Sequence, residues 1–375
     1  MRMLVRVCLL CCVALSIGCR LQAGSAASSM GQNAATIDAA TKPRTPLIGT
    51  WISSQRNGGE WHKLNDELIS TEPRRADGPL RHPPMIIYDG LGHWANTNMP
   101  VSLQQSKAND QLTPDEAKEV LAGVSTAFGT FVFSATHQLV FNHPHSYINT
   151  TAPFTAQGDT GIDRIKLLGF PPGQMIWKPL PLTRSDRISW GYWDKVPPLA
   201  QLTPAHRRLI GFWKVLSQER RKANGETLSS TPVEGGYIVY ASSGYMQFHL
   251  LQPNRDKWAT KRVQQFVREH PDEYYRIRDL TVSGVLEPTP AEAKMTLETY
   301  TAYVARYSID ERTRVVTHQG VGAISGQKGP DAHHSYEIAG NRLILTAPPT
   351  MVAGQEVRTV VTGERISGDD PALQP

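Results

Sequence analysis

The chain has 375 residues, enough for about two or three domains. Hydrophobic residues make up 40% and charged residues 19%, a composition typical of a globular protein with a hydrophobic core and not of a disordered chain. The formal net charge of +5 is small and dispersed, so we expect no nucleic-acid-binding face, which would need clustered basic residues.

The first residues have the pattern of an export signal. Arg2 and Arg6 precede residues 7–17, an apolar run interrupted only by Ser16. Since a bilayer span needs about 20 apolar residues, we interpret residues 1–19 as a signal peptide and not as a membrane anchor. We therefore expect the protein to be exported, as a periplasmic protein, an outer-membrane lipoprotein or a secreted protein.

Two processing sites remain open at the end of this segment. Residues 15–19 resemble a bacterial lipobox, which would place a lipid on Cys19, with Ser16 where leucine is usual. The small residues 23–27 offer an ordinary signal-peptidase site instead. A lipid on Cys19 would give the protein its only expected contact with a membrane.

Cysteine usage separates the signal segment from the rest of the chain. The cysteines are Cys8, Cys11, Cys12 and Cys19. Because the mature domains have none, we exclude a disulfide framework, a thiolate zinc site and a cysteine nucleophile. Residues 20–45 are rich in small and polar residues, which predicts a flexible tether.

The phrase Leu-Ile-Gly-x-Trp occurs twice, at residues 47–51 and 209–213. Each copy follows a proline-bearing stretch and opens a run of strand-forming residues. A self-similarity at this spacing indicates one structural unit used twice. We place unit one at residues 46–198 and unit two at residues 206–368.

Further matched patterns follow in the same order in both units. Residues 86–93 and 238–245 each contain a β-branched run that ends in tyrosine and leads into a glycine-containing turn, which predicts a hairpin. Thr113 and Thr289 each precede a proline and acidic residues, which predicts a capped helix start.

The fold class follows from the many short strands between Gly, Asn and Pro turns. We predict an all-β chain with two consecutive antiparallel β-barrels, each with a short helix. Closure is favoured because it removes exposed strand edges and leaves room for one small ligand.

Unit two carries the most specific signatures. They are Gly-Gly-Tyr-Ile-Val-Tyr at 235–240, Leu-Gln-Pro-Asn-Arg at 251–255, Tyr-Val-Ala-Arg-Tyr at 303–307, Val-Thr-His at 316–318 and Asn-Arg-Leu-Ile-Leu-Thr at 341–346. With the opening Gly-x-Trp, this order resembles the bacterial and fungal lipocalin-like domain family, and unit one resembles it more loosely. The resemblance implies an up-and-down barrel with an apolar internal cavity. Such barrels include carriers and a few cyclase- or isomerase-type enzymes, so the fold alone does not fix the function.

The resemblance also assigns a structural role to four residues. The tryptophan of Gly-x-Trp closes one end of such barrels, which places Trp51 and Trp213 at the barrel bases. Lys195 and Arg365, on the predicted last strands, would stack across these rings as cation–π partners.

The candidate ligand-binding residues are tyrosines and histidines of the predicted strands. They are Tyr88, Tyr240, His249, Tyr303, Tyr307 and His318. An inward tyrosine lines a cavity with its ring and orients a ligand with its hydroxyl. The same pattern also fits ordinary strand residues that bury a ring and leave the hydroxyl at the rim.

His318 is the candidate catalytic group, because a buried histidine can act as a general acid or base near neutral pH. A histidine with satisfied hydrogen bonds at a barrel rim fits the same position. For His249, the strand alternation does not decide which face looks inward.

We expect no metal and no cofactor. The pairs His143/His145 and His333/His334 supply two ligands each, without a third at a set spacing. The sequence contains no Gly-x-Ser-x-Gly motif, phosphate loop or dinucleotide fingerprint.

The leading hypothesis is an exported protein that binds a small apolar or amphipathic molecule in one or both barrels. One alternative is an enzyme that cyclises, isomerises or hydrates a natural-product intermediate. Another is a structural envelope module with filled barrels and an apolar contact surface. The sequence leaves open the ligand, the packing between the barrels and the oligomeric state.

Overall fold

A computed structural model describes most of residues 45–98, 111–149, 163–253 and 288–366, with short gaps in these ranges, and a few residues between 261 and 269. These residues belong to one compact unit, residues 44–375. The predicted signal peptide, Cys19 and nearly all of the tether lie outside the described residues. No described helix has the length and apolar character needed to cross a membrane.

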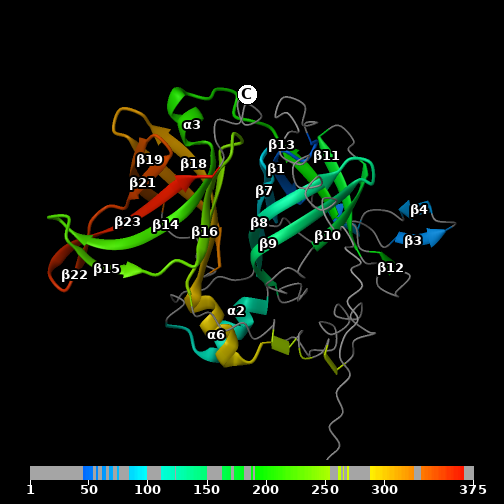
Figure 1. Cartoon of the computed structure of the whole chain (residues 1–375), viewed down its shortest axis with the longest axis horizontal. Coiled ribbons are helices and arrows are strands. Elements are labelled where there is room, and N and C mark those ends of the chain that lie inside the picture. The colour runs from blue at the N-terminus through cyan, green and yellow to red at the C-terminus, as the bar shows by residue number, and fades with distance from the viewer. Residues whose placement is uncertain are drawn as a thin grey trace, which may run out of the picture. The chain divides into compact units, whose positions relative to one another are not determined.

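The first half of the chain forms a closed antiparallel barrel, barrel 1, with the strand order β1-β13-β11-β10-β9-β8-β7-β6 (Figure 1). Its strands are β1 (Gly49–Ser53), β6 (Met85–Tyr88), β7 (His93–Asn98), β8 (Ser125–Ser134), β9 (Leu139–Asn149), β10 (Asp163–Gly169), β11 (Gln174–Leu180) and β13 (Gly191–Val196). Two small sheets accompany it, one of β2 (Arg56–Asn57) and β5 (Arg74–Arg75), the other of β3 (Trp61–Leu64), β4 (Glu67–Ser70) and β12 (Arg187–Ile188).

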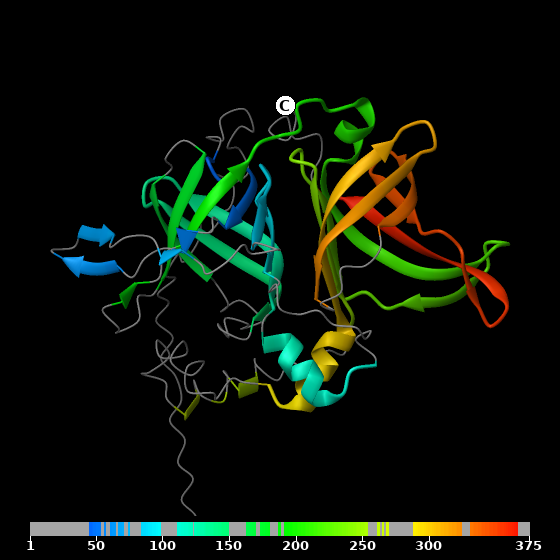
Figure 2. The same ribbon diagram turned by 180° about the vertical axis from the view of Figure 1, so that it is seen from behind.

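The second half forms a ten-stranded antiparallel sheet, barrel 2, which curls until β14 pairs with β23 (Figure 2). Its strands are β14 (Gly211–Lys222), β15 (Thr227–Thr231), β16 (Gly235–Tyr240), β17 (Tyr245–Leu251), β18 (Tyr300–Asp310), β19 (Val315–Ala323), β20 (Ala332–Ala339), β21 (Arg342–Thr346), β22 (Thr350–Val352) and β23 (Gln355–Arg365). The predicted all-β class is confirmed.

The same register occurs in both barrels. Trp51 pairs with Ile86 on one side and Lys195 on the other, and Trp213 pairs with Ile238 and Arg365 in the same way. Gly49 and Gly211, which start the two opening strands, have φ angles of 126° and 137°. Residues that carry a side chain rarely adopt such φ angles, which explains the glycine in the repeated phrase.

The predicted helix starts are also confirmed. Helix α2 (Pro114–Ala122) and helix α6 (Pro290–Thr299) each follow a threonine whose hydroxyl accepts a hydrogen bond from the backbone N–H three residues on. In return, Glu116 and Glu292 accept a hydrogen bond from the backbone N–H of that threonine. This reciprocal box satisfies two otherwise unpaired donors at each helix start. A third helix, α3 (Pro204–Leu209), leads into barrel 2.

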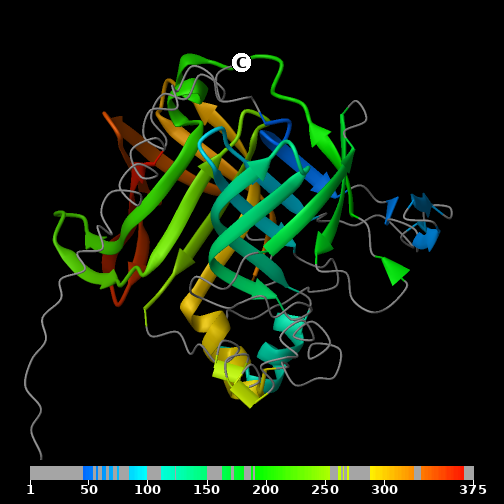
Figure 3. The same ribbon diagram turned by 45° about the vertical axis from the view of Figure 1, so that its right-hand side comes forward.

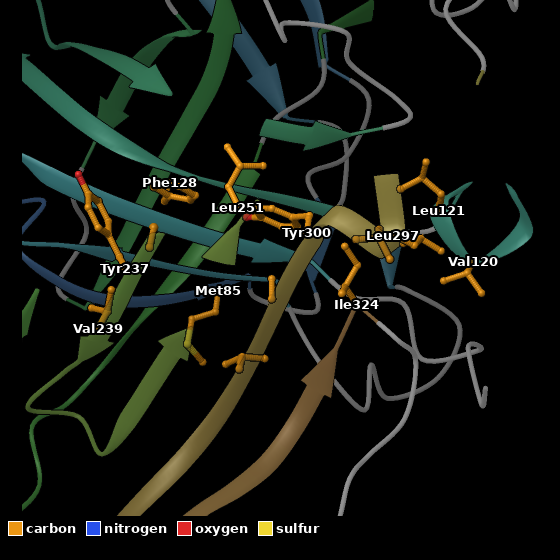
Figure 4. Close-up of a cluster of buried hydrophobic side chains, with 14 of the residues drawn as sticks. Met85, Val120, Leu121, Phe128, Tyr237, Val239, Leu251, Leu297, Tyr300 and Ile324 are labelled. Atoms are coloured by element: carbon orange, nitrogen blue, oxygen red, sulfur yellow. The ribbon is translucent and has the colours of Figure 1, made fainter. Parts of the chain in front are cut away.

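Helices α2 and α6 lie side by side and join a hydrophobic cluster built from both barrels (Figure 3). Figure 4 shows Leu121 and Leu297 from these helices near Tyr300, with Phe128 of barrel 1 and Tyr237 of barrel 2 in the same cluster. Two further clusters lie inside the barrels, one in each. The molecule therefore has one core inside each barrel and one shared core between them.

Candidate functional site

In both barrels, the tryptophan of the repeated phrase donates a side-chain hydrogen bond to the backbone four residues earlier. The indole Nε1 of Trp51 donates to the carbonyl oxygen of Leu47 at 2.6 Å, and that of Trp213 donates to the carbonyl oxygen of Leu209 at 2.8 Å. Both rings are buried. Their polar atoms are thus used inside the scaffold, which fits a structural role for these rings.

A basic side chain lies over each of these rings. The guanidinium carbon of Arg365 is 4.1 Å from the ring centroid of Trp213, and Nζ of Lys195 is 5.3 Å from that of Trp51. Arg365 also donates hydrogen bonds to the carbonyl oxygens of Ile210 and Arg208. The cation is therefore fixed by backbone contacts in barrel 2.

Barrel 2 brings together three of the candidate site residues from three strands. Nε2 of His318 is 2.7 Å from the hydroxyl of Tyr240, and Nδ1 is 3.1 Å from the hydroxyl of Tyr303. His318 is 2% exposed and Tyr240 is 1% exposed. Alternation along β19 places His318 on the same face as Val316, which belongs to the core inside barrel 2. We call Tyr240, His318 and Tyr303 the tyrosine–histidine triad.

Burial keeps this triad uncharged. Desolvation, together with the nearby His334, lowers the pKa of His318 to about 3. Desolvation also raises the pKa of Tyr240 and that of Tyr303 above the ordinary value. A neutral imidazole has one N–H and one acceptor nitrogen, so one hydroxyl accepts from His318 and the other donates to it. The triad can present a hydroxyl to a ligand without placing a charge inside the barrel.

Aromatic side chains surround the triad. The Tyr307 hydroxyl donates to the carbonyl oxygen of Ala241 at 2.9 Å, and its ring meets that of Tyr240 edge to face at 5.0 Å. The ring of Phe248 stacks on Tyr303 at 5.2 Å. The inner wall of barrel 2 is thus mostly apolar and aromatic. Its polar groups include the triad and His334, which pairs with Val316 and whose ring centroid is 4.8 Å from that of His318.

Tyr88 has the register position of Tyr240 but lies in barrel 1. Its ring is buried and meets Phe131 edge to face at 4.8 Å. Phe131 pairs with Asn142 in barrel 1, as Tyr307 pairs with His318 in barrel 2. Barrel 1 therefore has an amide where barrel 2 has the imidazole.

The structure places His249 outside barrel 2, between the two barrels. Nδ1 of His249 is 2.9 Å from the Tyr300 hydroxyl and 3.3 Å from Oγ1 of Thr126. Nε2 of His249 is 3.0 Å from Oε1 of Gln247, and Nε2 of Gln247 donates to the carbonyl oxygen of Met85. Desolvation lowers the pKa of His249 to about 3. His249 therefore connects the barrels and does not join the triad.

Sequence reasoning missed a set of polar atoms on the inner wall of barrel 1. Among the described residues, the buried atoms Trp94 Nε1, Trp177 Nε1, Trp193 Nε1 and Asn96 Oδ1 have no hydrogen-bond partner. The register could have found them, because strand alternation from Trp51 and Tyr88 marks the inward positions. The candidate ligand-binding residues predicted from the sequence were histidines and tyrosines and did not include these tryptophans.

No group of three metal-binding side chains occurs in the part of the chain that the structure describes. His333 and His334 lie next to each other on β20, where Nδ1 of His333 is 3.0 Å from the Thr317 hydroxyl.

Comparison with known proteins identifies one domain. No curated protein matches the chain. Among solved structures, a protein of unknown function of the DUF3598 family from Nostoc punctiforme is 9% identical, with 85% of this chain and 96% of that chain covered and a TM-score of 0.17. The dehydratase domain of PpsC from Mycobacterium tuberculosis, in complex with C12:1-CoA, is 13% identical, with 84% and 100% covered and a TM-score of 0.12.

TM-scores this low support no inference about activity. The family model of the lipocalin-like domain, by contrast, matches residues 210–366. This range begins one residue before β14 and ends one residue after β23, so it covers the whole curled sheet. Residues 210–366 of this chain therefore belong to the lipocalin-like domain family.

Proposed function

We propose that this protein is exported and binds a small apolar or amphipathic molecule inside a barrel, with barrel 2 as the principal site. The observation that carries the proposal is the tyrosine–histidine triad, a polar centre with His334 beside it, on a mostly apolar inner wall of a lipocalin-like domain. Ligand sites in proteins combine these two features, an apolar lining and a few convergent polar groups.

The binding mechanism is desolvation followed by orientation. An apolar ligand that leaves water gains about 25 cal/mol for each Å² of apolar surface it buries. The aromatic side chains Phe248 and Tyr307 would supply the apolar contact. A hydroxyl of Tyr303, which is partly exposed while Tyr240 is buried, would then bond the polar end of the ligand.

Export rests on the N-terminal sequence. Arg2 and Arg6 before the apolar residues 7–17 fit a signal peptide, and Cys19 fits a lipid attachment site. We propose a lipid on Cys19 as the protein's link to a membrane. Intact-mass measurement of the protein from its native host would show the mass of an acylated N-terminal cysteine or, if cleavage occurs at residues 23–27, a shorter unmodified chain.

The binding proposal is tested by purifying the mature protein under native conditions and identifying co-purified small molecules by mass spectrometry. The stripped protein is then titrated with N-phenyl-1-naphthylamine, whose fluorescence rises in an apolar site. We expect saturable binding that Tyr303→Phe weakens. Absence of any co-purified molecule, together with no saturable binding of the probe, would overturn the proposal.

An enzyme is the second candidate, because an imidazole between two tyrosine hydroxyls resembles an acid–base pair. The pKa of His318, lowered to about 3, argues against it, since an efficient general base has a pKa near the working pH. Turnover of a co-purified molecule that is lost in His318→Asn would favour the enzyme. Unchanged ligand recovered after long incubation would favour the binding protein.

A further inference from the structure

The inner wall of barrel 1 gathers indole N–H groups that have nothing to bond in the described structure. Trp94 is on β7, Trp177 on β11 and Trp193 on β13. All three indole nitrogens are buried without a partner among the described residues, as is Oδ1 of Asn96 on β7. The unpaired groups thus come from three strands.

The register shows that these side chains share one interior. Trp193 pairs with Ser53 of β1 and with Met175 of β11. Ser53 is two residues from Trp51 and Met175 is two residues from Trp177, so all of these side chains point to the same face of the sheet. The rings of Trp177 and Trp193 stack at 5.9 Å with an interplanar angle of 22°. Trp94 pairs with Tyr88 and lies in the same core cluster as Trp51, Trp177 and Trp193.

The other tryptophans whose side chains the structure describes are not in this state. Trp51 and Trp213, at the barrel bases, are buried and donate to backbone carbonyls. Folded proteins pair nearly all buried polar groups, because an unmet buried donor costs free energy. Three unmet donors and one unmet acceptor in one interior are therefore the atoms that a molecule bound inside barrel 1 would bond.

The atoms define the chemistry of that molecule. Three indole N–H groups need acceptors, and the amide oxygen of Asn96 needs a donor. No described lysine or arginine side chain is buried, so the described part of the interior offers no positive charge to balance a carboxylate or phosphate. Stacked indole rings favour a flat aromatic partner.

We propose that barrel 1 is a second ligand site, which takes a neutral, flat aromatic molecule carrying a carbonyl oxygen and a hydroxyl or N–H group. The carbonyl oxygen of the ligand accepts hydrogen bonds from the indole N–H groups of Trp94 and Trp193, and its hydroxyl or N–H group donates to Oδ1 of Asn96. This proposal rests on the proposed function, because it extends ligand binding to the barrel outside the lipocalin-like match and names the ligand class.

The test uses 2-naphthamide, which is neutral, flat and carries both a carbonyl oxygen and N–H donors. Naphthalene, which lacks polar groups, and 2-naphthoate, which is charged, are the matched probes. In the full mature chain, isothermal titration should show that 2-naphthamide binds at least about 10-fold more tightly than either, since each hydrogen bond contributes about a 5-fold gain. In ¹H–¹⁵N spectra, 2-naphthamide should move a subset of the indole N–H signals.

Variants locate the site. Trp94→Phe and Trp193→Phe keep a ring but remove the donor, so each should weaken 2-naphthamide binding about 5-fold. Trp51→Phe makes the same change where the N–H is already bonded to Leu47, and should leave the affinity within about twofold. If these variants do not fold, the indole signals of the unaltered protein still decide the question.

Two results would overturn the proposal: equal binding of naphthalene and 2-naphthamide, or no indole N–H signal that moves with 2-naphthamide. Water molecules alone would then satisfy the indoles. Tyr303→Phe separates the two sites, because it should weaken N-phenyl-1-naphthylamine in barrel 2 and leave 2-naphthamide unaffected. Binding of the first probe without the second would reject barrel 1 as a site and leave the proposed function standing.

Discussion

The interiors of barrel 1 and barrel 2 differ at equivalent positions of one shared register. Tyr88 and Tyr240 occupy the same place, but barrel 1 has Asn142 where barrel 2 has His318. In barrel 2 the polar groups bond one another, whereas the indoles of barrel 1 find no partner among the described residues. The duplicated frame is therefore held at the base tryptophan, while the side chains on the wall above it determine what each interior can bind.

The largest effect should come from the feature that the barrels share. Trp51→Ala and Trp213→Ala each remove a buried ring and its hydrogen bond, so each should lower the free energy of unfolding by about 3–5 kcal/mol. Urea unfolding followed by circular dichroism measures this. Val132→Ala, at a side chain that is 59% exposed, is the control and should cost less than about 0.5 kcal/mol. A loss below about 1 kcal/mol in either variant would show that the tryptophan does not stabilise the base of its barrel.

The next effect tests what the barrels do not share. His318→Asn gives barrel 2 the amide of barrel 1 and leaves the hydroxyls of Tyr240 and Tyr303 without their partner. We expect a loss of about 2–3 kcal/mol in the free energy of unfolding, the cost of unpaired buried groups. His333→Asn makes the same change at an exposed position and should have little effect. Equal losses in the two variants would mean that the triad does not stabilise barrel 2.

The third effect concerns pH. The pKa of His318 and that of His249 are each lowered from 6.5 to about 3 by burial. Between these values the unfolded chain binds a proton that the folded chain does not. The free energy of unfolding therefore falls as pH drops from 6.5 towards 3, by up to about 1.4 kcal/mol per pH unit for each histidine.

Urea midpoints measured between pH 7 and pH 4 should reveal this slope, and His318→Asn should reduce it by up to about 1.4 kcal/mol per pH unit. A slope that is the same in the variant would show that His318 is already accessible to protons in the folded protein.

The sequence predicted the frame well because the frame depends on local features. Gly49 and Gly211 repeat a positive φ angle, and the two threonine caps repeat a helix start, so the duplication was visible without any long-range contact. Strand alternation alone could not decide the face of His249, because it fixes relative orientation but not which side is inward.

The site was harder to predict because it depends on pairing between distant strands. Tyr240 and His318 are 78 residues apart, and only the register brings them to 2.7 Å. For the indoles of barrel 1, strand alternation could have marked the inward positions but not the missing hydrogen-bond partners. An unmet hydrogen bond has no sequence pattern, and it emerges only when every neighbour of Trp94 or Trp193 is placed.

The smallest effect distinguishes the two barrel bases. Arg365 lies 4.1 Å from its ring centroid and donates to two backbone carbonyls, whereas exposed Lys195 lies 5.3 Å from its ring centroid. Arg365→Met should therefore lower the free energy of unfolding by about 1–2 kcal/mol, and Lys195→Met by about 0.5 kcal/mol. Urea unfolding of both variants measures the difference. Raising the salt concentration should not abolish the loss in Arg365→Met, because its hydrogen bonds to carbonyl oxygens are partly shielded from solvent. Equal losses would mean that the cation–π contact, and not the backbone bonding of the guanidinium, determines how each base is held.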